Sequence, residues 1–262
     1  MRRAILIFSA VFIAGCAATG TTPTSSSSAI PVSEQMPTGI AEKSAKTHTE
    51  LGTLYLEAGN FAVALEESRY AAATDPNYAP AYNLMGLVHL MLNETSQAKG
   101  AFERAIQLAP SDPQIANDYG WFLCVSGREQ EAFKYFETAS RNPLYRTPTR
   151  PYTNAGLCYL RIKDDKSAEM NFQRAVLLDG SNAQATYHLA SLSYKRGDYF
   201  NAKKLLGELH KLIEPNAESL WLGVRIERKI GDRQAEAGYS SQLRRKFAGT
   251  PEYQALMQGK FE

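Results

Sequence analysis

The most constraining feature of this chain is a unit of about 34 residues that occurs six times between Ala45 and Gly249. In each unit, a small residue is followed twelve positions later by an alanine. Successive small residues lie 34, 34, 36, 34 and 33 positions apart, and they are Gly52, Gly86, Gly120, Gly156, Ala190 and Gly223. The alanines are Ala64, Ala98, Ala132, Ala168, Ala202 and Ala235. A fixed period of this length predicts a helical solenoid, a fold that binds partners along an extended surface.

The rest of each unit predicts two helices and a residue that ends the second helix. Bulky residues lie four positions after the alanines at Phe102, Phe136, Phe172, Leu206 and Tyr239, with Ser68 as the exception. The second helix then ends at Pro76, Pro110, Pro143, Gly180 or Pro215. This pattern resembles the tetratricopeptide repeat through most of residues 45 to 249. The resemblance implies an all-α, right-handed superhelical solenoid of six repeats, with about 12 to 13 helices.

The repeat divides the chain into intervals. The repeats are expected at 45–78, 79–112, 113–146, 149–182, 183–215 and 216–249, followed by a C-terminal cap at 250–262. Two extra residues around Thr147 and Pro148 predict a longer turn between the third and fourth repeats. In the divergent sixth repeat, Leu222-Gly223 and the turn Gly231-Asp232 imply registers one residue apart.

The N-terminus reads as an export signal over residues 1–15. Arg2 and Arg3 precede an apolar stretch from Ala4 to Ala14, which is shorter than the roughly 20 residues that span a bilayer. The sequence Ile13-Ala14-Gly15-Cys16 resembles the bacterial lipobox, in which the cysteine sulfur is the nucleophile that takes a lipid. An ordinary signal peptide with a chance cysteine is the alternative.

The residues after the cysteine predict a tether and a location. By the same resemblance, Ala17 implies the outer membrane, with the protein facing the periplasm. The stretch that follows is rich in serine, threonine and proline and has almost no large apolar residues, so it cannot bury a core. We therefore expect residues 16–44 to be a lipidated cysteine and a flexible tether with a reach of about 30 Å. Stable anchoring needs more than one acyl chain on Cys16.

Charge and motifs argue against several function classes. The chain has 29 basic and 27 acidic residues, and loss of Arg2 and Arg3 with the signal leaves no excess positive charge for nucleic acid. The histidines show no pairing at metal-ligand spacing, and they are His48, His89, His188 and His210. No catalytic triad order, phosphate-binding loop or carboxylate pair stands out. We expect no enzyme, metal, cofactor or small-molecule substrate.

Cys124 and Cys158 lie 34 residues apart, each on the first helix of its repeat. After export they meet an oxidising compartment. The two-residue insertion between their repeats changes their relative phase, so that neighbouring helices bring them face to face. We favour a disulfide, because unpaired thiols are unusual in secreted chains. Two separate buried thiols, behaving as small hydrophobes, are the alternative.

The tetratricopeptide resemblance also implies a partner-binding groove, because in that family the first helices line a concave surface. The matching positions here are Thr49, Thr53, Leu56, Asn83, Leu87, Leu90, Asn117, Trp121, Thr153, Leu157, Arg161, Tyr187, Ser191 and Tyr194. This set is apolar and aromatic with scattered amides and lacks a cluster of lysines and arginines. It suits an extended or helical peptide with hydrophobic side chains. Trp121 is the favoured anchor, and packing between helices is its alternative role.

Several short segments resemble one family more closely. These are Asn117-Asp118-Tyr119-Gly120-Trp121-Phe122-Leu123, Asn154-Ala155-Gly156-Leu157, Leu222-Gly223-Val224-Arg225 and Glu252-Tyr253-Gln254. With the lipobox, they resemble the type IV pilus biogenesis and stability lipoproteins of the PilF/PilW family. The resemblance implies an outer-membrane pilotin or chaperone that localises the pilus secretin and promotes its multimerisation. We expect the protein to be a monomer. The alternative is a repeat lipoprotein that serves peptidoglycan hydrolases or outer-membrane protein assembly.

Overall fold

The computed structural model describes residues 30–261, which form six antiparallel helix pairs, one further α-helix and one short 3-10 helix. The pairs are α1 (Ile40–Glu57) with α2 (Phe61–Thr74), α3 (Ala79–Met91) with α4 (Thr95–Leu108), α5 (Pro113–Val125) with α6 (Glu129–Arg141), α7 (Arg150–Arg161) with α8 (Asp165–Leu178), α9 (Ala183–Lys195) with α10 (Tyr199–Leu212), and α11 (Ala217–Ile230) with α12 (Arg233–Lys246). From residue 79 onward, each predicted repeat interval encloses one complete pair.

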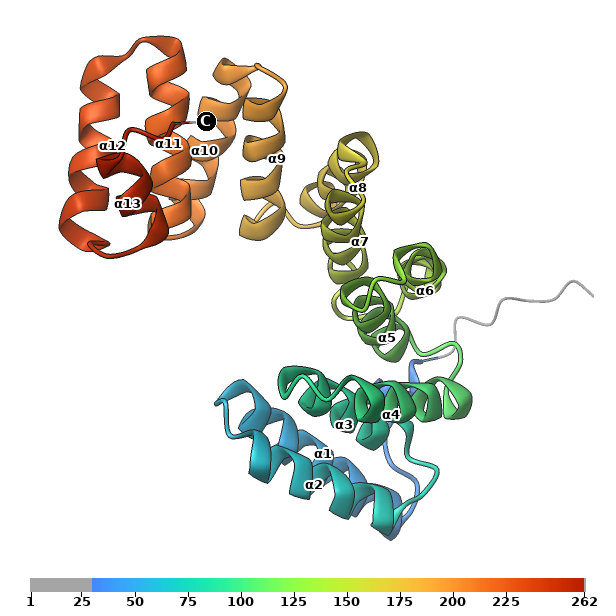
Figure 1. The fold of residues 1–262 in the computed structure, drawn as a ribbon. Coiled ribbons are helices and arrows are strands. Elements are labelled where there is room, and N and C mark those ends of the chain that lie inside the picture. Colours follow the sequence, from blue (N-terminus) through green and yellow to red (C-terminus); the bar gives the residue numbers. More distant parts are fainter. Residues whose placement is uncertain (1–29, 262) are drawn as a thin grey trace, which may run out of the picture.

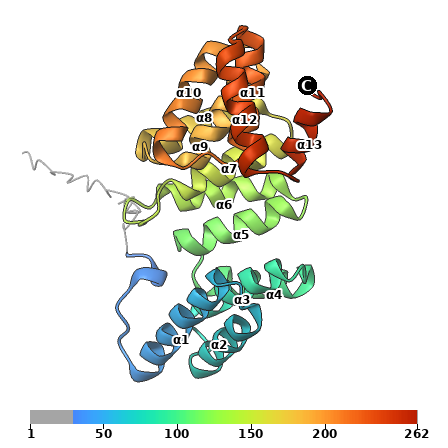
Figure 2. The ribbon, with the colours of Figure 1, turned by 90° about the vertical axis from the view of Figure 1, so that its left-hand side faces the viewer.

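The pairs stack in chain order into a superhelix (Figures 1 and 2). In Figure 1 the chain rises from α1 and α2 at the bottom to α12 and α13 at the top, and α5 to α8 form the bend between them. Consecutive first helices contact each other, as α1 does with α3 and α3 with α5. The first helices therefore share one face of the solenoid. None of the helices within residues 30–261 is long and apolar enough to cross a bilayer.

Each close crossing within a pair depends on a small residue facing a bulky one. A Cβ placed on Gly120 would lie 2.8 Å from the ring of Phe136, and one on Gly156 would lie 2.6 Å from the ring of Phe172. These contacts are closer than real Cβ atoms make, so the glycines let the paired helices approach. The regular spacing of small and bulky residues therefore sets how the two helices of a pair cross.

The connection between α6 and α7 is longer than the others, as the insertion predicts. It spans residues 142–149, whereas the connection between α4 and α5 spans only 109–112. Its Tyr145 is buried and donates a hydrogen bond from its hydroxyl to Gln114 Oε1 at 3.0 Å. Burial raises the pKa of this hydroxyl to about 12, so it remains a donor at neutral pH. The insertion thus folds back onto the start of α5.

The sixth pair accommodates both registers that its sequence implies. In the third pair the left-handed turn residue Gly127 comes seven positions after Gly120, whereas Gly231 comes eight positions after Gly223. Helix α11 ends seven positions after Gly223, whereas α5 ends five positions after Gly120. The turn into α12 is one residue shorter and α12 begins one position later in its repeat, while Ala235 keeps the usual spacing of twelve from Gly223.

The segment before α1 is attached to the solenoid, which corrects the predicted end of the tether at residue 44. Helix α1 begins at Ile40, and the 3-10 helix η1 (Val32–Glu34) lies along α3. Ser33 donates its backbone N–H and its hydroxyl to Asp112 at 2.7 and 3.1 Å. Residues 1–29, including the predicted signal peptide and Cys16, lie outside the described residues.

A second polar contact holds the same segment. The carboxylate of Glu34 accepts from the backbone N–H of Arg146 at 3.1 Å and pairs with its guanidinium at 3.0 Å. Arg146 belongs to the long connection between α6 and α7, so the segment that precedes the first repeat contacts both the second and the third repeats. Sequence patterning missed this attachment because it rests on individual polar contacts rather than on an apolar stripe.

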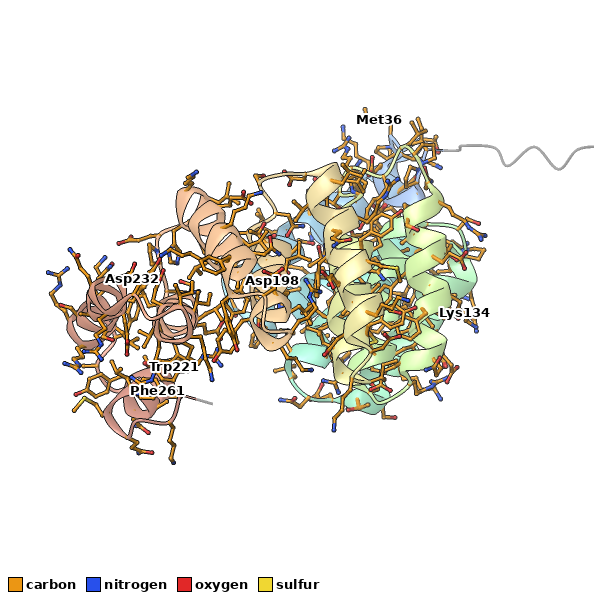
Figure 3. The ribbon with its side chains drawn as sticks, turned by 90° about the horizontal axis from the view of Figure 1, so that it is seen from above. Met36, Lys134, Asp198, Trp221, Asp232 and Phe261 are labelled. Carbon is orange, nitrogen blue, oxygen red and sulfur yellow. A yellow bond between two sulfur atoms is a disulfide. The ribbon has the colours of Figure 1, made fainter. Side chains whose placement is uncertain are left out.

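The solenoid ends in α13 (Pro251–Met257), which packs on α11 and α12. Leu256 is buried in one cluster with Leu220 and Leu243. Beyond this helix, Phe261 stacks on Trp221 with ring centroids 5.5 Å apart, at the end of the molecule labelled in Figure 3. Helix α13 therefore takes the place of a seventh first helix and covers the apolar end of the stack.

Candidate partner-binding groove

A groove with a volume of about 480 Å³ lies over α1, α3 and the start of α5, on the face formed by the first helices. Its walls include the apolar side chains of Leu84 and Leu87. Five of the predicted contact residues line it, namely Thr49, Thr53, Leu56, Asn83 and Leu87. Its rim also carries charged residues, among them Lys46, Glu50, Glu57 and Arg150. The groove therefore combines an apolar wall with polar and charged groups.

Two buried oxygens in this groove have no hydrogen-bond partner. They are Thr49 Oγ1 and Asn83 Oδ1. The other end of the Asn83 amide is fixed, because its Nδ2 donates to Asp118 Oδ2 at 2.9 Å. A buried acceptor without a donor costs about 1 to 3 kcal/mol. Both oxygens are enclosed beneath the open surface of the groove, so they belong to its floor rather than to its accessible surface.

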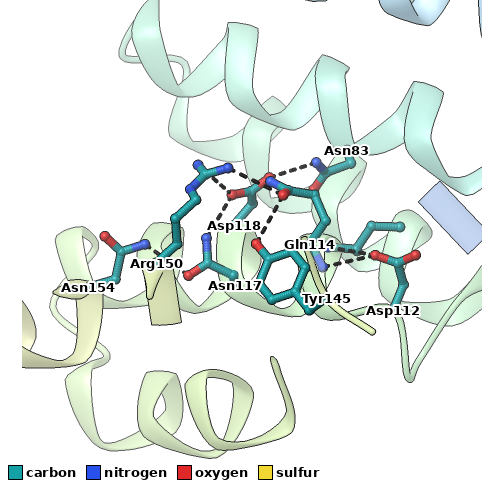
Figure 4. Close-up of polar contacts among 9 residues, drawn as sticks. Asn83, Asp112, Gln114, Asn117, Asp118, Tyr145, Arg150 and Asn154 are labelled. Carbon is teal, nitrogen blue, oxygen red and sulfur yellow. Dashed lines mark hydrogen bonds and ion pairs between the residues drawn. The ribbon is translucent and has the colours of Figure 1, made fainter. Parts of the chain in front are cut away.

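The floor of the groove is organised around the buried carboxylate of Asp118 (Figure 4). Besides Asn83, it accepts from Gln114 Nε2 at 2.7 Å, from Asn117 Nδ2 at 3.0 Å and from Arg150 Nη2 at 3.5 Å. These donors come from α3, α5 and α7, so one carboxylate joins the first helices of three repeats. Charged hydrogen bonds of this kind are the stronger class, and they make the floor rigid.

Four residues predicted to contact a ligand are largely buried between first helices, although Thr49 and Asn83 still line the groove. They are Thr49, Asn83, Asn117 and Thr153, each less than 9% exposed. Asn117 Oδ1 accepts from Asn154 Nδ2 at 2.9 Å, and Thr153 Oγ1 accepts from Asn182 Nδ2 at 3.0 Å. Consecutive first helices approach closely here, so the polar groups of Asn117 and Thr153 are used in hydrogen bonds between neighbouring repeats. Thr49 and Asn83 each keep an enclosed oxygen without a hydrogen-bond partner among the described residues.

The remaining predicted positions continue the same face beyond the groove. Leu90 and Trp121 pack, partly buried, against the central core cluster, and Leu157 packs against the next cluster. Arg161 is exposed and pairs with Glu129 at 3.7 Å. On α9, the partly buried positions are Tyr187, Ser191 and Tyr194. Trp121 thus contributes to packing while part of its surface stays open.

Cys124 of α5 and Cys158 of α7 form a disulfide, with their Cα atoms 5.9 Å apart. The sequence had left a pair of buried thiols as the alternative. The bond joins the third and fourth repeats, whose connection is the long turn. Both half-cystines belong to the same buried cluster as Phe136. The disulfide therefore reinforces the junction beside the groove floor.

The histidines take part in packing and local hydrogen bonds. His188 stacks on Phe172 with ring centroids 4.9 Å apart, and burial lowers its pKa. His89 Nδ1 lies 2.5 Å from a carboxylate oxygen of Glu94 at the following turn. Within residues 30–261, no group of three or more histidine, cysteine, aspartate or glutamate side chains is placed to hold a metal ion.

The stacked pairs and the groove of their first helices define a tetratricopeptide-repeat protein. Family models of this repeat match residues 49–113, 83–144 and 149–182. The type IV pilus assembly protein PilF of Pseudomonas aeruginosa is 30% identical over 213 residues, which cover 81% of this chain and 84% of that protein. The chain belongs to the PilF/PilW family.

Two solved structures of this family share the fold. The structure of Pseudomonas aeruginosa PilF has a TM-score of 0.76 at 28% identity and covers 84% of this chain and 99% of its own. The crystal structure of PilW, described as a widely conserved type IV pilus biogenesis factor, has a TM-score of 0.74 at 26% identity and covers 81% and 98%. The predicted all-α superhelical solenoid is confirmed.

Proposed function

We propose that this chain is a lipid-anchored outer-membrane scaffold for type IV pilus biogenesis, which acts as pilotin or chaperone for the subunits of the pilus secretin. Its membership of the PilF/PilW family carries this proposal, because the relative in Pseudomonas aeruginosa is a type IV pilus assembly protein. In this proposal Cys16 carries the lipid, and the protein works as a monomer facing the periplasm. No catalytic step is part of this role.

The groove of the first three repeats is the proposed contact for the secretin subunit. Leu84 and Leu87 would cover apolar side chains of an unassembled segment, which otherwise promotes aggregation. The exposed polar side chains of Glu50 and Thr53, which line the same groove, would accept from its backbone N–H groups. Main-chain hydrogen bonds with side-chain pockets are a general mode of peptide recognition.

The groove can be tested by filling it. Thr53 is exposed and lines the groove, so Thr53→Trp should block the apolar wall without removing any core side chain. Gln107→Trp, at an exposed position on α4, is the matched control. We expect Thr53→Trp to lose co-purified secretin and to reduce secretin multimers on immunoblots, and the control to behave as wild type. Wild-type secretin binding by folded Thr53→Trp protein would overturn the proposed site.

The anchor is tested separately with Cys16→Ala. We expect this variant to keep its helical fold but to leave the outer-membrane fraction, because the lipid only provides location. Secretin assembly should fall with it. Co-purification of peptidoglycan hydrolases or of the outer-membrane protein assembly machinery, in place of secretin, would instead favour the adaptor alternative.

A further inference from the structure

A second pocket lies at the opposite end of the solenoid and has different chemistry. It has a volume of about 710 Å³ and lies between α9, α11 and the C-terminal residues. Its lining includes the rings of Tyr194 and Phe261 and four cationic side chains, Arg225, Arg228, Lys229 and Lys260. Among residues 30–261, none of those that line it is acidic. The sequence had indicated no cluster of lysines and arginines on this face, because the predicted groove positions did not include α11, which carries three of these cations, and Lys260 joins them only through the fold.

Three of the four cations lack an acidic partner. Arg228 pairs with Glu236 at 2.9 Å, whereas Arg225, Lys229 and Lys260 form no ion pair within residues 30–261. Arg225 Nε is buried and has no hydrogen-bond partner. Gathering unpaired cations around one cavity is unfavourable unless an anion enters it. The pocket therefore holds unused binding capacity for negative charge.

Aromatic rings hold the central cation in place. The Arg225 guanidinium lies 5.0 Å from the ring centroid of Tyr194 and 5.7 Å from that of Trp221. Such cation–π contacts orient the planar guanidinium without neutralising it. A positioned guanidinium binds a carboxylate through two parallel hydrogen bonds. Arg225 is thus oriented to bind a carboxylate group through directed hydrogen bonds.

The pocket also belongs to the face that carries the groove. Tyr194 is one of the first-helix positions of that face, on α9. At the far end, the groove is lined by three acidic residues, Glu50, Glu57 and Asp118, and by two basic residues, Lys46 and Arg150. The same polarity occurs along the chain, because residues 40–112 contain nine acidic and five basic residues, whereas residues 217–262 contain eight basic and six acidic. The excess charge therefore changes from acidic in the first two repeats to basic in the sixth repeat and the cap.

We propose that the C-terminal pocket is a docking site for an acidic segment of a partner protein, whose carboxylates pair with Arg225, Lys229 and Lys260. The site would fix the direction in which the partner lies along the face. This inference rests on the proposed role as a partner-binding scaffold. It can fail on its own, because Thr53→Trp blocks the distant groove and leaves this pocket intact.

The experiment measures the binding of two synthetic peptides by isothermal titration calorimetry. One is Gly-Phe-Asp-Glu-Asp-Glu, and the other has the same length with Asn and Gln in place of Asp and Glu. The full mature chain is titrated as wild type, as Lys229→Gln/Lys260→Gln, and as Lys204→Gln/Lys211→Gln. The last variant removes the same charge from exposed positions on α10, outside the pocket.

We expect wild type and the α10 control to bind the acidic peptide at least tenfold more tightly than the amide peptide. Lys229→Gln/Lys260→Gln should lose most of that preference, and Thr53→Trp should keep it. Equal binding of the two peptides, or equal losses in both lysine variants, would overturn the proposal. Binding to phosphatidylglycerol vesicles that depends on Lys229 and Lys260, without acidic-peptide binding, would assign the pocket to lipid headgroups and also overturn it.

Discussion

Gly86 and Phe102 share one site at the crossing of α3 and α4, because a Cβ on Gly86 would lie 2.8 Å from three atoms of the Phe102 ring. We expect Gly86→Leu to destabilise the protein by about 1 to 3 kcal/mol or more, since the overpacked ring must move. Neighbouring repeats pack against this helix pair, so the loss of stability should extend to them. Ala98→Phe, which overfills the same junction from α4, should have a similar effect. Thermal and urea unfolding measure both.

Gly100 provides the control for Gly86. It lies within α4, and a Cβ there meets no atom within 4 Å. Gly100→Ala should therefore raise stability by about 0.5 to 1 kcal/mol, because alanine favours the helix. If Gly86→Leu melts within a degree or two of wild type, the assigned crossing is wrong.

Two turns place an ordinary residue in the left-handed conformation that glycine occupies in other repeats. Asn93 has φ of 60° and Lys163 has φ of 61°, whereas the equivalent position of the third repeat is Gly127. We expect Lys163→Gly to stabilise the protein by about 0.5 to 1 kcal/mol, because a Cβ is disfavoured there. Asn93→Gly should gain less, since asparagine tolerates this conformation.

A second lysine provides the control for that prediction. Lys166 lies on the exposed surface of α8, so Lys166→Gly should instead cost about 1 kcal/mol of helix stability. Chemical denaturation distinguishes the stabilisation expected for Lys163→Gly from the destabilisation expected for Lys166→Gly. Destabilisation by both lysine substitutions would contradict the turn assignment.

The solenoid was predictable from the sequence because each crossing depends on residues of a single repeat. Gly156 and Phe172 are sixteen positions apart, and the same spacing recurs in other repeats. The crossing can therefore be recognised from the repeat pattern of the sequence. The contact between Ser33 and Asp112 joins residues 79 positions apart and occurs once. No period can indicate such a contact. The basic pocket was missed for the same reason, because Arg225 and Lys260 meet only through the cap.

The sequence also left the role of Asp118 open. The Asn117-Asp118 segment suggested the family, but only the fold brings Asn83 and Arg150 to the same carboxylate. We expect Asp118→Asn to destabilise the protein by about 1 to 3 kcal/mol, because an amide cannot accept from all of these donors. Secretin binding should fall as the groove floor loosens. Denaturation and co-purification test this, and wild-type values in both would show that the carboxylate is dispensable.

Stability should fall in mild acid because of two partly buried histidines. Burial lowers the pKa of His188 and of His210 below 6.5. The unfolded chain therefore binds protons first as the pH falls, and the stability present above about pH 6.5 is progressively lost. We expect His188→Phe to flatten the dependence of unfolding free energy on pH between about 7 and 5. The comparison uses the slope of the unfolding free energy against pH, so a change in stability that is the same at every pH does not affect it. An unchanged slope would contradict this origin.

The disulfide should be a major source of stability at the junction of the third and fourth repeats. Cys124 and Cys158 close a loop with a separation of 34 residues, for which chain entropy gives about 3 to 4 kcal/mol. That is a large part of a typical domain stability of about 5 to 15 kcal/mol. Reduction should lower the melting temperature by roughly 6 to 16 °C. It should also speed hydrogen exchange in α5 and α7, which support the groove floor.

The control for reduction is the variant Cys124→Ala/Cys158→Ala, whose melting should not respond to the reductant. Non-reducing peptide mapping of periplasmically expressed protein measures the bond directly. Two alkylatable thiols in the folded protein would refute the bond and support buried thiols instead. If the bond forms but reduction leaves the melting temperature unchanged, the long turn and the contacts of Tyr145 and Asp118 hold the junction without it. The two measurements therefore separate whether the disulfide exists from whether the stack depends on it.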